Sequence, residues 1–215
     1  MTDEELMRAA LDEAKIAADL GEVPVGAVVA KDGEIVARAH NLRESGKNAT
    51  YHAELMAIDA ACKALGGWRL WQCELFVTLE PCPMCSGAII NSRLKRVVYG
   101  ARDPKAGCCG SLTDLFALPF NHHPVIESGL LEDEAQALLQ DFFVMLREKR
   151  RKSCDAQGRI PYPSAEGSRP LPTKRFKGGA VGANMVRPCP FAAAASFPGG
   201  YRIRPYGLNT GRVLP

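Results

Sequence analysis

The sequence predicts an α/β fold, and three local patterns within its first 152 of 215 residues support this prediction. A capping box, Thr2-Asp3-Glu4-Glu5, precedes a stretch with apolar residues at helical spacing. Asp32-Gly33 lies between two short apolar runs, which is typical of a β-hairpin. The succession of strand, helix and strand over 74–99 has short connections, so its two strands are expected to run parallel.

The boundaries of the expected elements follow from capping and turn residues. Gly66-Gly67 ends the second helix, and Pro83 suits the first turn of the third because its missing N–H is not needed there. The last helix has acidic residues at its start and basic residues at its end, which complements the helix dipole. In chain order we expect a helix that Thr2 caps and Gly21 ends, strands over 25–30 and 35–39, a helix over 52–65, a strand over 74–79, a helix over 83–92, strands over 96–99 and 125–127, and a helix over 131–152.

Charge and composition divide the chain into two parts. Residues 1–152 carry 18 Lys and Arg against 22 Asp and Glu, whereas residues 153–215 carry 9 against 2. Nucleic-acid binding by the first part must therefore depend on local patches rather than on net charge. Residues 153–215 contain 9 Pro and 9 Gly, and we expect a basic disordered extension, or a read-through or frame-shifted sequence.

The sequence gives no sign of export or of a membrane span. Its first residues are acidic and amphipathic, unlike a secretory signal, and no stretch has the length and apolarity of a membrane helix. Eight cysteines that include a CxxC point to metal binding in a reducing compartment rather than to a disulfide scaffold. We therefore expect a cytoplasmic protein with no membrane partner.

One His and two Cys form the most informative pattern in the chain. His52, Cys82 and Cys85 can hold a zinc ion and leave its fourth position open for water. Each of the three lies at an expected helix start, where the positive end of the helix dipole stabilises a thiolate. Zinc lowers the pKa of water towards ~7, and Glu54, two residues after His52, is well placed to take the proton. The pattern predicts a catalytic zinc site with Glu54 as the proton carrier.

His-x-Glu followed by Pro-Cys-x-x-Cys is the signature of zinc-dependent nucleobase deaminases. The resemblance extends further, to the family of bacterial tRNA adenosine deaminases, in order and in spacing. The matching segments are 22–27, 40–41, 52–54, 81–89, 100–105 and 141–143. The resemblance spans residues 3–152 and does not cover 153–215.

The resemblance implies a cytidine-deaminase-like three-layer α/β/α sandwich with a five-stranded mixed sheet over residues 1–152. It implies hydrolytic deamination of the wobble adenosine of an arginine tRNA, anticodon ACG, to inosine. It also implies a homodimer with one Zn²⁺ per subunit and the tRNA anticodon loop bound near the subunit interface. The wobble base would leave its stack and enter a pocket above the metal.

Several residues are expected to contact the substrate by this resemblance. Asn41 would hydrogen-bond the base, although a loop Asn that makes a turn is the alternative. Val23, Phe142 and Phe143 would line or support the base pocket, with core packing as the alternative for the two Phe. Arg102, Asp103 and Lys105 follow a strand where the family contacts RNA. A wider basic patch that faces phosphates would comprise Arg93, Lys95, Arg96, Arg102 and Lys105, unless it is only a solvated face.

Other functions stay open from the sequence. A deaminase acting on a free nucleobase, nucleoside or nucleotide of the cytosine or guanine type would use the same zinc motif. A nucleic-acid-binding module with structural zinc would need a fourth ligand, and Cys62 or Cys73 would supply it, but both lie in or beside apolar runs that favour buried thiols. We expect Cys108-Cys109 to be small packing residues, with an oxidation-sensitive pair as the alternative.

Overall fold

The structure is a computed structural model, and it describes residues 1–156. Of the extension predicted over 153–215, residues 157–215 lie outside the described residues. All nine predicted elements are present, with boundaries within a few residues of those expected; the last helix continues past residue 152. The elements are α1 (Asp3–Asp19), β1 (Gly26–Lys31), β2 (Glu34–His40), α2 (Ala53–Leu65), β3 (Cys73–Leu79), α3 (Pro83–Ser92), β4 (Arg96–Ala101), β5 (Val125–Ser128) and α4 (Glu132–Ala156).

The five strands form one mixed sheet in the order β2-β1-β3-β4-β5. β1 is antiparallel to both of its neighbours, whereas β3, β4 and β5 run parallel to one another. It follows that β2 shares the direction of β3, β4 and β5, and that β1 is reversed. The parallel pair predicted for β3 and β4 and the five-stranded mixed sheet are confirmed.

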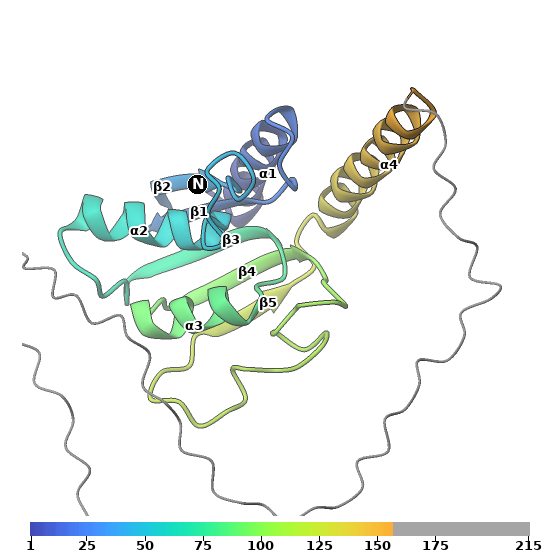
Figure 1. Ribbon diagram of the computed structural model, residues 1–215. Helices are drawn as coiled ribbons and strands as arrows, with labels where there is room; N and C mark the ends of the chain where they lie inside the picture. The colour runs from blue at the N-terminus through green and yellow to red at the C-terminus, as the bar shows by residue number, and fades with distance from the viewer. Residues whose placement is uncertain (157–215) are drawn as a thin grey trace, which may run out of the picture. The chain divides into compact units, whose positions relative to one another are not determined.

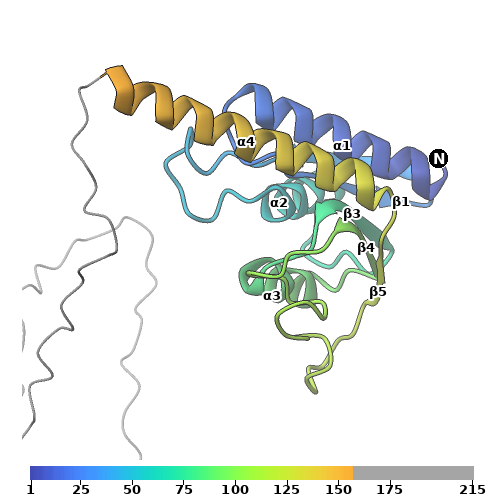
Figure 2. The same ribbon diagram turned by 90° about the vertical axis from the view of Figure 1, so that its right-hand side faces the viewer.

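Helices cover both faces of the sheet, which gives three layers. α1 and α4 lie on one face, and α2 and α3 lie on the other (Figures 1 and 2). Side chains of the strands alternate between these layers: Val28 packs with Leu6 and Met7 of α1, whereas Val29 belongs to the cluster that contains Ala57 of α2. Strands buried on both faces explain the nearly continuous apolar runs in the sequence.

The local signals in the sequence act as expected. Thr2 and Glu5 form both hydrogen bonds of the capping box, with Thr2 N–H donating to Glu5 Oε2 at 2.8 Å. Asp32 and Gly33 both have positive φ, at 51° and 77°, which matches the two-residue turn that suits a right-twisted hairpin. Gly66 ends α2 in the left-handed conformation, and Pro83 begins α3.

The direction of the strands determines where the functional side chains meet. β2 and β3 point the same way, so their carboxyl ends lie at one edge of the sheet. α2 follows β2 and α3 follows β3, so both helices begin at this edge. Ligands of α/β sheets bind at such an edge, near the helix N-termini.

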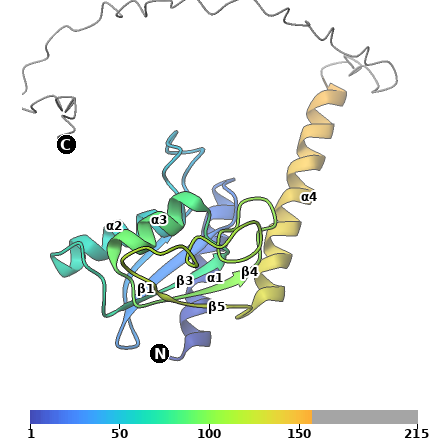
Figure 3. The ribbon, with the colours of Figure 1, turned by 90° about the horizontal axis from the view of Figure 1, so that it is seen from below.

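The C-terminal half of α4 extends beyond the rest of the described chain (Figure 3). It carries the basic residues that end the predicted helix. None of the helices within residues 1–156 is both long and apolar enough to cross a membrane.

Candidate active site

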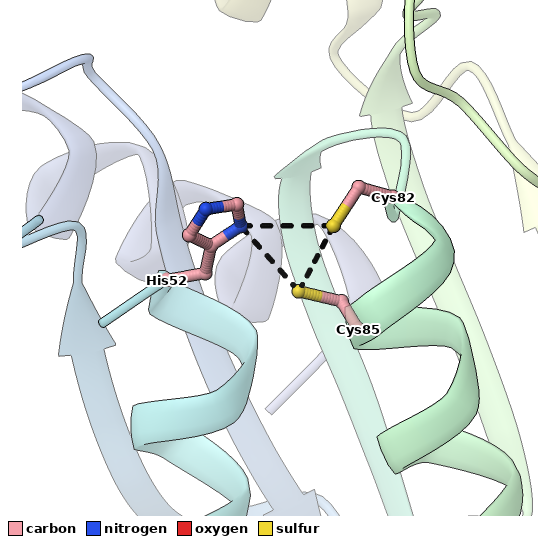
Figure 4. A group of neighbouring side chains, drawn as sticks. All are labelled: His52, Cys82 and Cys85. Carbon is pink, nitrogen blue, oxygen red and sulfur yellow. Dashed lines mark hydrogen bonds between the residues drawn. The ribbon is translucent and has the colours of Figure 1, made fainter. Parts of the chain in front are cut away.

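Two helix N-termini bring His52, Cys82 and Cys85 together. His52 is the N-cap residue of α2 and Cys82 is the N-cap residue of α3, with Cys85 in the first turn of α3. The His52 Nδ1 atom lies 3.7 Å from Cys82 Sγ and 3.6 Å from Cys85 Sγ, and the two sulfurs are 3.5 Å apart (Figure 4). Neither N-cap side chain caps its helix, so both remain directed at this cluster.

The spacing of these three atoms fits a zinc ion. With Zn–S of about 2.3 Å and Zn–N of about 2.0–2.1 Å, tetrahedral ligands lie about 3.6–3.8 Å from one another. The observed separations are within about 0.3 Å of those values. One imidazole nitrogen and two thiolates form a donor set that zinc prefers. Three protein ligands leave a fourth position open, as in catalytic zinc sites.

The two sulfurs differ in protonation. The pKa of Cys82 is lowered to about 4, chiefly by the hydrogen bond between the two sulfurs and also by His52 beside it, whereas the same contact and burial raise the pKa of Cys85. One sulfur of the pair therefore carries a negative charge, and a metal ion would displace the proton of the other. Glu54 lies in the first turn of α2 and is 4% exposed. Burial raises the pKa of the Glu54 carboxyl, which makes it a better proton acceptor than a solvated carboxylate.

A cavity of about 240 Å³ opens onto this cluster, and its lining combines candidate metal ligands, a buried carboxyl group and predicted substrate contacts. Its lining includes the candidate ligands His52 and Cys82, the carboxyl residue Glu54, and the predicted substrate contacts Val23, Asn41 and Asp103. A larger hollow of about 530 Å³ lies between β2 and α2, but none of the three candidate ligands lines it. The smaller cavity is therefore the candidate active site.

Asn41 is held in place by the buried carboxylate of Glu22, which no motif in the sequence marks as functional. Glu22 is 1% exposed, and its carboxylate accepts hydrogen bonds from Asn41 Nδ2 at 3.3 Å and from the N–H groups of Glu44 and Ser45 at 3.1 and 2.6 Å. Burial acts to raise the Glu22 pKa, but these hydrogen bonds outweigh it and hold the pKa below its ordinary value. A charged Glu22 thus fixes the loop after β2, on which Arg43 also lines the cavity.

A second buried carboxylate, Glu80, performs the same task on the other side of the cavity. It is 2% exposed and accepts hydrogen bonds from the loop after β4. Burial acts to raise its pKa, and the hydrogen bonds from Ser111, Asp103 and Cys109 outweigh this and lower it. An acidic residue directly after a buried strand and before Pro-Cys is the signal that could have identified it.

The basic patch expected over Arg93, Lys95, Arg96, Arg102 and Lys105 is wrong as a single surface. β4 runs from Arg96 to Ala101, about 17 Å at ~3.3 Å per residue, and only its carboxyl end adjoins the cavity. At the far end, Arg96 pairs with Asp3, Glu74 and Glu127 at 2.6, 3.0 and 2.6 Å. Arg102 and Lys105 are exposed at the cavity end, next to Asp103.

The two predicted aromatic contacts lie away from the cavity lining. Phe142 is 6% exposed and borders a separate hollow with Ala18 and Gly21. Phe143 is 42% exposed, and its ring packs edge-on against that of Phe142, with the ring centroids 5.6 Å apart. Core packing is thus what Phe142 does within one copy of the chain. A contact between either ring and the substrate stays a prediction.

The four other cysteines whose side chains the structure describes lie outside the cluster of candidate ligands. Cys73 is buried and Cys62 half-buried, both packed in the core on the α2 side of the sheet, so neither supplies a fourth ligand. Cys108 is fully buried and Cys109 half-buried, in agreement with the packing role expected for them. Burial raises the pKa of both thiols, which disfavours reactive thiolates.

Comparison with known proteins identifies the family. The sequence model of the MafB19-like deaminases matches residues 1–147, which include all the groups of this site. The tRNA-specific adenosine deaminase of Bacillus subtilis is 54% identical over 153 residues, which cover 70% of this chain and 95% of the relative. This chain belongs to the tRNA-specific adenosine deaminase family. Another member, from Agrobacterium fabrum, is 46% identical over 67% of this chain and 93% of its own length.

Solved structures agree with this family. A chain from structural studies of A-to-I editing by tRNA:A34 deaminases has 45% identity and a TM-score of 0.61, over 63% of this chain and 99% of that one. A guanine deaminase from Nitrosomonas europaea has 25% identity and a TM-score of 0.55, and the match covers 66% of this chain and 84% of that one. The chain is thus a hydrolytic enzyme with the fold of these deaminases.

Proposed function

We propose that this protein is a zinc-dependent tRNA adenosine deaminase that converts the wobble adenosine of tRNA-Arg, anticodon ACG, to inosine. One observation carries the proposal: a His52, Cys82 and Cys85 cluster with zinc spacing shares one cavity with the buried carboxyl of Glu54. The identity of 54% to a tRNA-specific adenosine deaminase supports the substrate class.

The reaction replaces the amino group at C6 of adenine by oxygen from water and releases ammonia. Bound at His52, Cys82 and Cys85, zinc supplies a Lewis acid that lowers the pKa of the attacking water. Glu54 accepts the first proton of that water and delivers it to the ring nitrogen beside C6 as the oxygen adds to C6. It then accepts the second proton, from the new C6 hydroxyl, and delivers it to the amino group, which leaves as ammonia while the C6 carbonyl forms. A buried carboxyl suits both transfers, because burial raises its pKa and makes it a better proton acceptor than a solvated carboxylate.

The size and surroundings of the cavity favour a single flipped base. About 240 Å³ is small for a ligand cavity and suits one nucleobase, while the rest of an RNA would stay outside. Asn41 in the lining provides an amide for hydrogen bonds to the base edge, and Val23 provides an apolar wall. A base in an anticodon loop is unpaired, so its extrusion costs less than that of a paired base.

The RNA backbone would be bound at the cavity rim. Arg102 and Lys105 are exposed on the loop after β4, next to Asp103 in the cavity lining, and they supply positive charge for phosphates. We further propose a homodimer with one zinc ion per subunit, in which the anticodon loop lies near the interface. In such a dimer Phe142 or Phe143 of one subunit would be available to the substrate of the other.

A deaminase of a free base is the second candidate. The likeness to a guanine deaminase, at 25% identity, supports it, since the same metal ligands serve several bases. The exposed cations beside the cavity favour RNA, because a free base has no phosphates to bind.

The proposal is tested with purified, zinc-loaded protein and four substrates: an arginine-tRNA anticodon stem-loop with a wobble adenosine, free adenosine, guanine and cytidine. We expect inosine only in the stem-loop. Turnover of guanine or a free nucleoside, with the stem-loop untouched, would retain the deaminase chemistry and refute the RNA substrate.

A further inference from the structure

Glu80 connects the candidate metal centre to a neighbouring loop. It directly follows β3 and lies two residues before Cys82, and its own N–H donates to the carbonyl of Ala101 at 2.9 Å, so its backbone is fixed by pairing with the end of β4. Its side chain is 2% exposed and lines the cavity. The carboxylate is therefore held by the sheet in a constant position beside the active site.

Both oxygens of this carboxylate are occupied by donors from one segment, residues 103–111. Oε1 accepts from the N–H groups of Cys109 at 2.8 Å and Ser111 at 3.1 Å. Oε2 accepts from the N–H of Asp103 at 3.1 Å and from the Ser111 hydroxyl. A single side chain thus holds both ends of the loop, through hydrogen bonds that a charged acceptor strengthens.

The loop is shaped to enclose the carboxylate. A Cβ atom at Gly107 would lie 2.3 Å from Glu80 Cδ and 2.6 Å from the carbonyl oxygen of Asp103, so no side chain fits there. Gly107 N–H donates to that carbonyl at 2.8 Å, and Cys108 N–H donates to the carbonyl of Pro81 at 2.9 Å. The loop therefore closes around Glu80 and the chain just before Cys82.

The groups proposed to meet the RNA lie on this loop and on Arg102, the residue directly before it. Asp103 and Ala106 line the cavity, and Arg102 and Lys105 are exposed beside them. We propose that Glu80 is a positioning residue that orders this loop, so that its cations reach the RNA backbone while a base occupies the cavity. The inference rests on the proposed function for the identity of the ligand, but the ordering of the loop does not.

The ordering is tested without RNA, by hydrogen exchange on the full-length, zinc-loaded protein. Glu80→Gln keeps the shape of the side chain but turns one acceptor into a donor that faces N–H groups, so the amides of residues 103–111 should exchange about 10- to 100-fold faster. Glu22→Gln is the matched control, because Glu22 is an equally buried carboxylate that binds the N–H groups of Glu44 and Ser45 instead. Glu22→Gln should accelerate exchange at the amides of Glu44 and Ser45 and leave those of residues 103–111 protected.

The functional part is tested by a mutant cycle with the anticodon stem-loop. Glu80→Gln should raise KM about 10-fold or more with a smaller change in kcat, at an unchanged zinc content. It should also flatten the dependence of log Kd on log salt by about 1–2 units, as expected when one or two phosphate contacts are lost. Combined with Arg102→Gln and Lys105→Gln, it should add little further loss, because all three changes remove the same contacts.

The outcomes separate the two proposals. Unchanged exchange at 103–111 in Glu80→Gln, or losses that add fully to those of the two cation variants, would overturn the positioning role. If Glu80→Gln failed to fold, Ser111→Ala would serve instead, because it removes only the hydroxyl donor to Glu80. It should raise KM about threefold and flatten the salt dependence in the same way. A normal KM and a normal salt slope in Ser111→Ala would overturn the role. A wild-type protein that ignores the stem-loop but shows the predicted exchange would refute the proposed substrate and retain the ordered loop.

Discussion

Replacement of Glu54 by Gln is the sharpest perturbation of the proposed chemistry. The two side chains have nearly the same volume, and Glu54 is 4% exposed, so the change leaves no cavity. Gln cannot carry a proton between water and the base. A positioned acid or base contributes about 10²–10⁴-fold to a rate, and Glu54 serves more than one transfer, so kcat should fall at least ~10³-fold, about 4 kcal/mol in the barrier.

Stability and metal content should respond differently from the rate. Burial raises the pKa of the Glu54 carboxyl and thus disfavours its charged form, whereas a neutral amide carries no such cost. The Tm of Glu54→Gln should therefore stay unchanged or rise. The three ligands His52, Cys82 and Cys85 remain, so zinc content should stay the same.

The assay is single-turnover deamination of the anticodon stem-loop, with zinc measured on the same samples. Glu13→Gln is the matched control, since Glu13 pairs with His40 at 2.8 Å outside the active-site cavity, and its rate should stay within about threefold of wild type. Normal turnover by Glu54→Gln would refute the assigned role. So would a loss of activity that simply follows a loss of zinc.

Three further predictions concern the metal, the salt response and acid stability. Cys85→Ala should lose zinc and lower the Tm, since Cys85 is buried and two ligands cannot hold the ion; metal analysis of the purified protein checks this. Arg102→Gln with Lys105→Gln should weaken stem-loop binding and reduce the salt slope by about 1–2, measured by titration at several salt concentrations. Arg96→Gln should lower the unfolding free energy by about 1–2 kcal/mol near pH 7. The loss is no greater because two of the three carboxylate partners of Arg96 are about half exposed and screened by solvent. Denaturant melts at several pH values measure it.

The sign of the pH effect follows from the lowered pKa values of Asp3 and Glu127, which hydrogen bonds to Arg96 cause. A carboxyl with a depressed folded-state pKa stabilises the fold above its unfolded pKa, about 4, and loses that contribution as the pH falls through its folded value. The difference between wild type and Arg96→Gln should thus be greatest near neutral pH and shrink below about pH 4. Lys15→Gln, which breaks an exposed pair with Asp12, should change stability by less than about 0.5 kcal/mol at any pH.

Contradictory outcomes are equally definite for these variants. One zinc per chain in Cys85→Ala would remove Cys85 from the ligand set. An unchanged salt slope in the double variant would mean that Arg102 and Lys105 do not meet phosphate. A stability difference for Arg96→Gln that persisted at pH 2 would show that packing, rather than ion pairing, explains the effect.

The sequence predicts the framework because its signals are local. The capping box at Thr2, the Asp32-Gly33 turn and Pro83 at a helix start each act within a few residues, and each is present in the structure. The candidate ligands could be predicted because His52, Cys82 and Cys85 form a His and CxxC pattern at two expected helix starts, with Glu54 close by in the sequence. The structure adds why they meet: β2 and β3 run in the same direction, so the helices that follow them begin at one edge of the sheet.

The parts that could not be predicted depend on long-range contacts. Glu22 looks like an ordinary acidic residue in the sequence, and Glu80 is marked only by its place between a buried strand and Pro-Cys. The fold shows that each is buried and accepts hydrogen bonds from a separate loop. The basic patch was wrong because neighbours in the sequence lie at opposite ends of β4. Arg96, near the start of that strand, is committed to three carboxylates far from the cavity.

The most direct test of the whole account is deamination of full-length tRNA-Arg by the zinc-loaded protein, with inosine mapped along the RNA. The account predicts inosine at the first anticodon position and no conversion of adenosines in the paired stems, because an unpaired base costs less to extrude into the cavity while its flanking phosphates lie against Arg102 and Lys105. No inosine at that position, with free nucleobases or nucleosides turned over instead, would contradict it.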